Sequence, residues 1–418
     1  MRIRFLGACN EVGRSAIAVY DGNKHVLFDY GVIMNHEVGF PMHIPTRDLD
    51  AIILSHAHLD HSGLIPLFYL GESLPLYGIE PTFQLTNVLI KDFLHLSGYY
   101  LPYEYIDLQN MLGKRVSMKL NERFRIGNAE FILINAGHIP GSCQIIMEFN
   151  GEKLLYTGDF NPIPSRLLEP AEQIYKNLDA LIIESTYADE EHPDRAKLEE
   201  DFVKKTREVI HEGGTVLVPA FGVGRSQEIL MILTAHKFEY PIFIDGMAIE
   251  VTKIFMDYHE SLRDSKLFEK AVKKVKWIKG WKNRRKAVKT PSVIISPAGM
   301  LKGGAAAFYS EALAKSDKNA IFLVSYQVPG SPGRLLLEKG KLPIKGKLRK
   351  VEAQVEKFDF SSHAGKRELQ EFLSKLDSKT KVFVVHGAEG NCVKLASWAN
   401  KELGLNAAAP NPGEIYET

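Results

Sequence analysis

The stretch His56-Ala57-His58-Leu59-Asp60-His61 places three imidazoles and one carboxylate within six residues. It follows the apolar run Ala51-Ile52-Ile53-Leu54, which is typical of a buried strand, so we expect the polar cluster on the loop that ends this strand. Imidazole and carboxylate groups are good zinc ligands, and a tight turn lets neighbouring side chains face two adjacent ions. The stretch therefore predicts ligands for two metal ions: His56 and His58 for one, Asp60 and His61 for the other.

Further motifs make the chain resemble the metallo-β-lactamase superfamily. The HxHxDH stretch is similar to the second motif of that superfamily, and the others follow in chain order: Asp29 with Gly31 as the first, His138 in Ala-Gly-His-Ile-Pro-Gly-Ser as the third, and Asp159 in Tyr-Thr-Gly-Asp as the fourth. The resemblance implies two zinc ions per chain. One takes His56, His58 and His138; the other takes Asp60, His61 and a late histidine; Asp159 bridges them, and Asp29 orients a histidine ligand.

Three later motifs resemble those of the β-CASP nucleases within this superfamily. Glu184 in Ile-Ile-Glu-Ser-Thr-Tyr is like motif A, His363 in Asp-Phe-Ser-Ser-His-Ala-Gly is like motif B, and His386 in Phe-Val-Val-His-Gly is like motif C and supplies the late histidine. The resemblance covers essentially the whole chain. It is strongest to archaeal and bacterial ribonucleases related to the endonuclease subunit of the eukaryotic cleavage and polyadenylation specificity factor. One departure is Ala388, where relatives often carry Glu, with Glu389 one residue later.

The resemblance implies a zinc-dependent ribonuclease that hydrolyses phosphodiester bonds with a metal-activated water. We expect His363, Glu184 and Asp60 to be the catalytic residues. Imidazole titrates near working pH, and His363 is not needed as a ligand, so it is the candidate general acid. Glu184 would hydrogen-bond this histidine, fix its tautomer and keep it protonated. The alternative for His363 is a loop histidine that contacts phosphate only.

The resemblance implies an α/β fold: a metallo-β-lactamase αββα sandwich interrupted by an inserted β-CASP α/β domain. Strands with intervening helices in the first part suit such a sandwich. Buried strands that alternate with helices after about residue 189 predict a parallel sheet. We therefore expect the metallo-β-lactamase domain at 1–188 and 359–418 and the β-CASP domain at 189–358.

Composition is ordinary for a soluble globular protein: 418 residues, 45% hydrophobic and 25% charged. No apolar run approaches the ~20 residues of a membrane-spanning helix, and the first residues lack the features of a signal peptide. The three cysteines, Cys9, Cys143 and Cys392, form no CxxC pair. This count suits a reducing compartment, so we expect a cytoplasmic protein without disulfides.

The net charge of +1 does not indicate nucleic-acid binding, but the charge distribution does. Ten of the twenty residues from Lys270 to Lys289 are Lys or Arg, with Trp277 and Trp281 among them. Basic groups contact phosphates and aromatic rings stack on bases, although a solvated helix face with packed tryptophans is the alternative. Glycine-rich loops after strands add candidate RNA contacts: Arg225, Ser296, Lys302 and Arg334, together with Ser361 and Ser362 of motif B.

The expected partner is RNA, preferably single-stranded, with a homodimer and RNA-processing or exosome-like proteins as further expected partners and no membrane. Two other functions keep the fold: a small-molecule hydrolase such as a thioesterase or lactonase, and a non-catalytic RNA-processing subunit. A small-molecule hydrolase would not need motifs A to C, and a non-catalytic subunit would have lost metal-ligand residues. A flavodiiron oxidoreductase would carry Glu where His58 stands. The sequence leaves open whether cleavage is endonucleolytic, 5′-to-3′ exonucleolytic or both.

Overall fold

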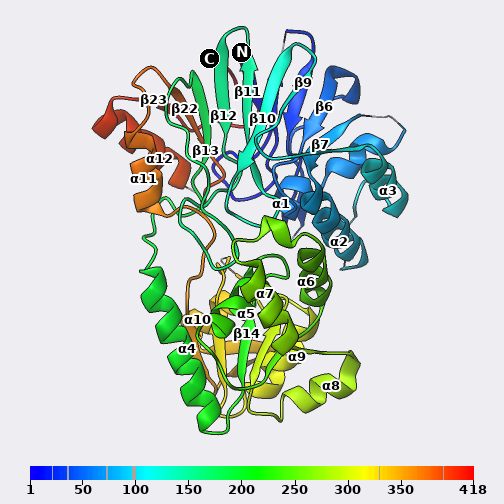
Figure 1. The fold of residues 1–418 in the computed structure, drawn as a ribbon, viewed down its shortest axis with the longest axis vertical. Helices are drawn as coiled ribbons and strands as arrows, with labels where there is room; N and C mark the ends of the chain where they lie inside the picture. The colour runs from blue at the N-terminus through cyan, green and yellow to red at the C-terminus, as the bar shows by residue number, and fades with distance from the viewer. Residues whose placement is uncertain (21, 35–36, 72–73, 97–99, 329, 389) are drawn as a thin grey trace. The chain divides into compact units, whose positions relative to one another are not determined.

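The computed structural model describes residues 1–418 except 21, 35–36, 72–73, 97–99, 329 and 389. The chain forms two compact units (Figure 1). Unit 1 comprises Met1–Pro164, Glu169–Glu191 and Ser362–Thr418, and unit 2 comprises Ser165–Leu168 and His192–Ser361. Both main junctions lie three residues after the expected divisions. The short segment Ser165–Leu168 was not expected in unit 2.

Unit 1 is built on two seven-stranded mixed sheets. The first has the order β24-β1-β2-β3-β6-β7-β8, with bounds Ile415–Glu417, Arg2–Phe5, Ile17–Tyr20, His25–Phe28, Leu49–Ile53, Leu76–Ile79 and Arg115–Met118. The second has the order β23-β22-β13-β12-β11-β10-β9, with bounds Asn406–Ala408, Lys381–Val385, Ala180–Glu184, Glu152–Tyr156, Cys143–Phe149, Ala129–Asn135 and Arg123–Ile126. A small hairpin pairs β4 (Ile33–Met34) with β5 (Val38–Gly39).

Helices cover the outer faces of these two sheets (Figure 1). Their bounds are α1 Leu59–Ser62, α2 Glu80–Leu96, α3 Tyr105–Gly113, α11 Lys366–Ser374 and α12 Asn391–Leu403, with short 3₁₀ turns at Thr46–Asp48 and Ile65–Tyr69. Alternate strand residues pack between the sheets, as Phe28 and Phe131 do, while residues of the opposite parity, such as Ile52, pack against α2 and α3. On the other side Val384 packs under α11 and α12. The expected αββα sandwich is confirmed.

Unit 2 contains a six-stranded sheet in which every strand pair is parallel. Its order is β16-β15-β17-β14-β18-β21, with bounds Lys276–Trp277, Ile242–Ile244, Val293–Ser296, Val216–Pro219, Ala320–Leu323 and Gln354–Lys357. One face packs against α4 Arg195–His211, α5 Arg225–Ala235, α6 Met247–Asp257 and α7 Ser265–Lys274, with a 3₁₀ turn at His259–Ser261. The other packs against α8 Gly280–Ala287, α9 Gly304–Leu313 and α10 Pro332–Lys339. A hairpin of β19 (Lys341–Ile344) and β20 (Lys347–Lys350) completes the unit.

The expected parallel sheet is confirmed. Crossover helices connect its strands, and the four inner strands, β15, β17, β14 and β18, are buried on both faces. Among the described residues, no helix combines the length and hydropathy that spanning a bilayer requires.

Candidate metal centre and catalytic residues

The expected ligands and Asp29 follow the carboxyl ends of strands in unit 1. Asp29 comes directly after β3, His56 follows β6, Asp159 follows β12, and His386 comes directly after β22. Within each sheet these strands run parallel: β3 beside β6, and β12 beside β13 and β22. Parallel strands end at one edge of a sheet, so residues far apart in the sequence meet there.

The HxHxDH stretch differs from the expected loop in one respect. Asp60 and His61 lie on a single helical turn, α1, and this turn is held from behind by the segment after β3. The backbone N–H of Tyr30 donates to the His61 carbonyl at 2.8 Å. A Cβ at Gly31 would lie 1.8 Å from the Asp60 carbonyl oxygen, so only glycine allows this approach.

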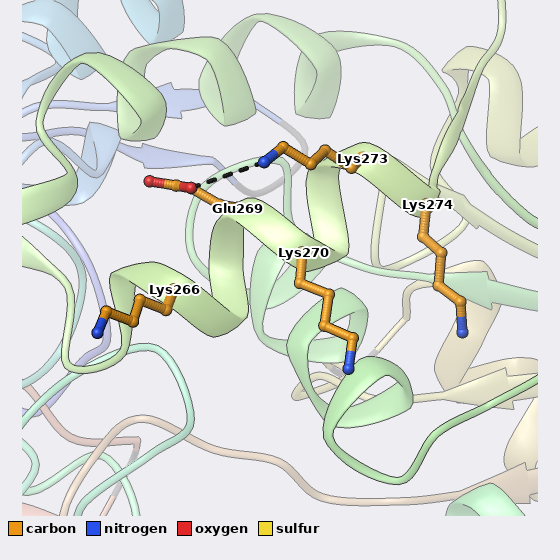
Figure 2. A pocket seen from close by; sticks show the side chains of 5 residues that line it. All are labelled: Lys266, Glu269, Lys270, Lys273 and Lys274. Carbon is orange, nitrogen blue, oxygen red and sulfur yellow. Dashed lines mark ion pairs between the residues drawn. The ribbon is translucent and has the colours of Figure 1, made fainter.

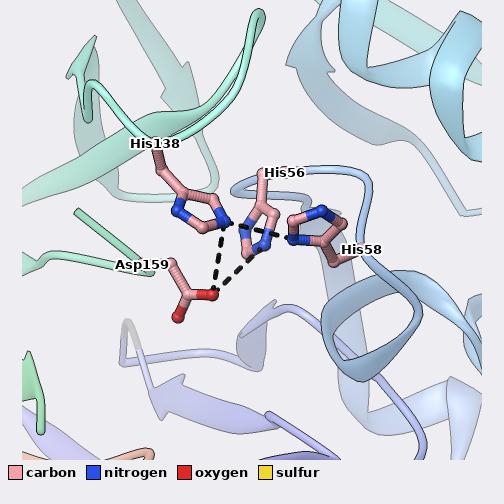
Figure 3. A group of neighbouring side chains, drawn as sticks. All are labelled: His56, His58, His138 and Asp159. Atoms are coloured by element: carbon pink, nitrogen blue, oxygen red, sulfur yellow. Dashed lines mark hydrogen bonds and ion pairs between the residues drawn. The ribbon is translucent and has the colours of Figure 1, made fainter. Parts of the chain in front are cut away.

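Four of the expected ligands, His56, His58, His138 and Asp159, lie close together (Figure 3). His56 Nε2 lies 3.4 Å and His138 Nε2 3.7 Å from Oδ2 of Asp159, and His58 Nδ1 lies 3.1 Å from His138 Nε2. His138 donates its Nδ1–H to the Ser362 carbonyl at 2.8 Å, which leaves Nε2 free to face the group.

The second set uses the other oxygen of the same carboxylate. Oδ1 of Asp159 lies 3.3 Å from His61 Nε2 and 3.2 Å from His386 Nδ1, while His386 Nε2 lies 3.4 Å from Oδ2 of Asp60. Each set has four donor atoms that all lie within 4.8 Å of one another. Asp159 therefore belongs to both sets and presents one carboxylate oxygen to each.

The residues present fit metal ions. His56 Nε2, Asp159 Oδ1 and His386 Nε2 are buried, and no hydrogen-bond partner for them lies among the described residues. Such groups cost free energy unless something binds them. Burial, with the charge of neighbouring imidazoles, lowers the pKa of His56 and His138 well below the ordinary value, so both are neutral donors. Burial opposes ionisation of Asp159, but His386 and His61 hold its pKa well below the usual range.

Asp29 lies behind the ligands and accepts several hydrogen bonds. Its Oδ2 accepts from His61 Nδ1 at 2.7 Å, from the Ser55 hydroxyl at 2.7 Å and from the Tyr156 hydroxyl at 2.9 Å, while Oδ1 accepts the Ser55 N–H at 2.7 Å. The carboxylate thus orients His61 so that Nε2 faces Asp159. The sequence interpretation missed Ser55 and Tyr156. The sequence offered a signal for each. Ser55 directly precedes the HxHxDH stretch, and Tyr156 belongs to the Tyr-Thr-Gly-Asp motif at the end of a buried strand.

His363 and Glu184 form a pair beside the metal ligands. His363 Nδ1 lies 3.0 and 2.9 Å from the two oxygens of Glu184, and the Phe160 N–H donates to Glu184 at 2.8 Å. The His363 ring centroid lies 4.5 Å from that of His138. Burial opposes protonation of His363, but the charges of Glu184 and Asp159 outweigh it and raise its pKa to about 9.

The candidate RNA contacts of unit 2 follow adjacent parallel strands at one sheet edge. Arg225 begins α5 after β14, Lys302 is exposed on the loop after β17, and Arg334 is exposed in the first turn of α10 after β18. Ser296 is different: it is fully buried and its hydroxyl donates to the Pro297 carbonyl at 2.9 Å. Ser361 and Ser362 are partly exposed at the end of unit 2 and the start of unit 1. Ala388 is described, but Glu389 lies outside the described residues.

A sandwich of two sheets with two histidine–aspartate donor sets at its strand ends defines a metallo-β-lactamase-fold hydrolase. Three family models match the chain: a β-lactamase superfamily domain at 25–213, a β-CASP domain at 226–336, and a Zn-dependent metallo-hydrolase RNA specificity domain at 349–410. The chain belongs to the β-CASP family of this superfamily, as the resemblance implied.

Relatives align over nearly the whole chain. "RNase aCSPSF2" of Saccharolobus solfataricus is 40% identical and the alignment covers 99% of this chain and 84% of the relative. "Probable RNase MJ4" of Methanocaldococcus jannaschii is 38% identical, and the alignment covers 99% of each of the two chains. "Transcription termination factor FttA" of Thermococcus kodakarensis is 34% identical over 98% of this chain and 70% of its own. The fold also matches a crystal structure of a protein of unknown function from Enterococcus faecalis, at TM-score 0.62, 15% identity and 99% coverage of both chains.

Proposed function

We propose that this protein is a two-zinc ribonuclease that hydrolyses phosphodiester bonds of single-stranded RNA, as an endonuclease and in a 5′-to-3′ exonucleolytic mode. The observation that carries the proposal is the shared carboxylate of Asp159, which stands between two donor sets beside the His363–Glu184 pair. The ribonuclease names of two relatives support the choice of RNA as substrate.

The proposed ligands are those that face Asp159. His56, His58 and His138 would hold one zinc ion, and Asp60, His61 and His386 the other, with Asp159 touching both. When bound, the ions supply Lewis acidity for a phosphate oxygen and an activated water. Asp29 holds the His61 ring in place from behind.

His363 is proposed to protonate the leaving sugar oxygen. Water attacks phosphorus and gives up one proton to solvent, the bond from phosphorus to the leaving oxygen breaks, and that oxygen takes the proton from Nε2 of His363. His363 then regains a proton from solvent. The Nδ1 atom is occupied by Glu184, so Nε2 is the atom that can donate. The side chain of Asp60 is 29% exposed beside the donor sets, and we assign it to hold the attacking water by a hydrogen bond.

Phosphates of the RNA are proposed to contact Arg225, Lys302 and Arg334, with Ser361 and Ser362 as hydroxyl donors. These residues supply charge or hydroxyls on loops that follow strand ends. Because Ser296 is buried, we assign it to support its loop rather than to touch RNA. A homodimer, RNA-processing partners and a cytoplasmic location stay predictions.

The test uses one unpaired RNA labelled at either end and the full chain with bound zinc. Labelled fragments of intermediate length from both labelled forms indicate endonuclease cleavage. Stepwise shortening of the 3′-labelled RNA from its 5′ end indicates the exonucleolytic mode. His58→Ala is expected to lose both zinc and cleavage. His363→Ala is expected to keep zinc and lose about 10²- to 10⁴-fold in rate. The matched control is His211→Ala, which removes an exposed histidine of unit 2.

Two outcomes would contradict the proposal. Hydrolysis of a thioester or lactone without any RNA cleavage would favour the small-molecule hydrolase. RNA binding without zinc and without cleavage would favour the non-catalytic subunit.

A further inference from the structure

Unit 2 carries a concentrated positive charge that the proposed chemistry does not use. From Lys270 to Lys289 the chain has ten basic residues and no Asp or Glu, whereas its total net charge is only +1. The stretch spans the end of α7, strand β16 and helix α8. Nine of the ten basic side chains are exposed, all except Arg284.

The charge continues along one side of α7. Lys266, Lys270 and Lys274 are four residues apart, so they lie on one face of this helix. Figure 2 shows their side chains extending from the same side, while Lys273 pairs with Glu269 at 3.9 Å on another. Lys274 also donates to the Phe238 carbonyl at 2.6 Å.

Among the residues that the structure describes, most of these cations have no carboxylate close by. Only Lys273 and Arg284 have a carboxylate oxygen within 4.0 Å among the described residues. The other eight do not: Lys270, Lys274, Lys276, Lys279, Lys282, Arg285, Lys286 and Lys289. Clustered like charges repel one another, so the cluster favours a partner that brings negative charge.

A fixed aromatic ring lies within this charge. Trp281 on α8 is 55% exposed, and the guanidinium of Arg284 lies 4.9 Å from its ring centroid. The rings of Trp281 and Phe308 form an edge-to-face pair, with centroids 5.3 Å apart and an interplanar angle of 89°. Arg284 is itself held by the buried Asp245, at 2.7 and 3.1 Å, and Asp245 also accepts from Tyr309 at 2.7 Å. The tryptophan is thus a preorganised ring with more than half of its surface in solvent.

The structure favours unpaired nucleic acid over a membrane or a duplex as the negatively charged partner. A membrane-binding helix needs a free apolar face, but Phe268, Ala271 and Val272 of α7 and Ala287 of α8 are buried in unit 2. A duplex keeps its bases stacked inside and offers little to Trp281. Unpaired nucleic acid offers both phosphates and open base faces.

We propose that Trp281 and the exposed cations from Lys270 to Lys289, which we call the basic–tryptophan surface, bind an unpaired segment of RNA outside the metal centre. A base stacks on Trp281, and Lys282, Arg285 and Lys286 contact phosphates. This inference rests on the proposed function in taking RNA as the substrate.

The test measures fluorescence anisotropy of a short labelled unpaired RNA over a series of salt concentrations, with the full chain carrying His58→Ala so that the RNA stays intact. The triple variant Lys282→Gln, Arg285→Gln, Lys286→Gln is expected to reduce the slope of log affinity against log salt by about 2, because each lost phosphate contact contributes about 0.7 for single strands. Its matched control is Lys197→Gln, Lys204→Gln, Lys318→Gln, three exposed lysines elsewhere in unit 2. The control is expected to change the slope little.

Trp281→Ala is expected to weaken binding roughly 5- to 150-fold, the range for loss of one stacked base. Trp281→Leu keeps an apolar contact with Phe308 but cannot stack, so it should weaken binding too, whereas Trp281→Phe should retain most of it. Thermal unfolding of each variant shows whether α8 is intact.

Three results would overturn the inference: equal slopes for the two triple variants, equal affinity for duplex and unpaired RNA, or tighter binding to phosphatidylserine vesicles than to RNA. Cleavage by the unmodified protein is scored separately. If the unmodified protein cleaves RNA but the α8 substitutions do not change RNA binding, only the proposed surface is refuted. If the α8 substitutions weaken binding but the unmodified protein does not cleave RNA, only the proposed catalysis is refuted.

Discussion

At the residue scale, the geometry of the proposed metal centre depends on side chains that are not themselves proposed as metal ligands. Tyr156 reaches Asp29 from the second sheet, while His61 and Ser55 reach it from the first. Burial, together with the charge of Asp29, raises the pKa of Tyr156 well above the ordinary value, so the phenol stays a hydrogen-bond donor. The ring orientation of His61 therefore depends on a hydrogen-bonded network that spans the sandwich.

Tyr156→Phe should lower zinc affinity by roughly tenfold or somewhat more, because partners of metal-bound histidines typically contribute 10- to 100-fold. Competition with a chelator of known affinity measures this. Tyr69→Phe is the matched control, since the buried Tyr69 hydroxyl has no hydrogen-bond partner among the described residues. Equal zinc affinity in both variants would show that Tyr156 does not position His61.

Glu184→Gln should shift the pH dependence of cleavage. As the proposed general acid, His363 would act only while protonated, so we expect activity to fall as pH rises through its pKa. Glu184 and the other carboxylates raise that pKa to about 9 against the effect of burial. Removing the charge of Glu184 lowers that pKa, so the falling limb of kcat/KM should move to lower pH. Measurement of kcat/KM against pH at a constant zinc concentration tests this prediction. A falling limb at the same pH in the variant would show that Glu184 does not raise the pKa of the catalytic acid. In His363→Ala the limb should disappear.

At the element scale, short turns set the ligand geometry. Helix α1 is only one turn long and packs directly on the segment after β3 through Gly31. Asp29 and His386 both have positive φ, 58° and 48°, which is uncommon for residues other than glycine and costs free energy. Both positions turn the chain sharply at a strand end, where each side chain must face the centre.

Gly31→Ala should therefore disrupt α1. The added methyl group would overlap the Asp60 carbonyl, and overpacking of this kind typically costs about 1–3 kcal/mol or more. Thermal unfolding should show a lower midpoint, and zinc titration a weakened second site. Gly113→Ala in α3 is the control, because a Cβ there meets nothing within 4 Å. Unchanged zinc binding in Gly31→Ala would mean that α1 adapts to the methyl group.

Much of the fold and of the candidate site was predictable, because residue types that bind metals occur together in short local motifs. The HxHxDH stretch contains four such side chains, and an apolar run before each motif places it at a strand end. The single turn at Asp60 was not predictable, because four residues carry too little periodicity to indicate a helix. Ser55 and Tyr156 were missed for a different reason: a buried hydroxyl looks like ordinary packing until its acceptor is known. The burial of Ser296 depends on packing that no local pattern contains.

At the scale of the whole molecule, all proposed ligands belong to unit 1 and none to unit 2. Zinc should therefore stabilise unit 1 selectively. A ligand at 100 times its dissociation constant adds about 2.7 kcal/mol to the unit that binds it. Calorimetry with and without a chelator should show one transition that moves with zinc and one that does not.

His58→Ala should reduce the zinc-dependent shift. Equal movement of both transitions, or none, would contradict the assignment of the ligands to unit 1.

The chain order of the second sheet has a consequence for synthesis. Strand β13 pairs with β22, and His386 follows β22 directly, so the second donor set needs a residue made just over two hundred positions after Glu184. All of unit 2 except its first short segment is translated between them. A ribosome-bound chain shorter than 386 residues cannot assemble the pair of donor sets. For a protein proposed to cut RNA, this order keeps the growing chain inactive beside the messenger that encodes it.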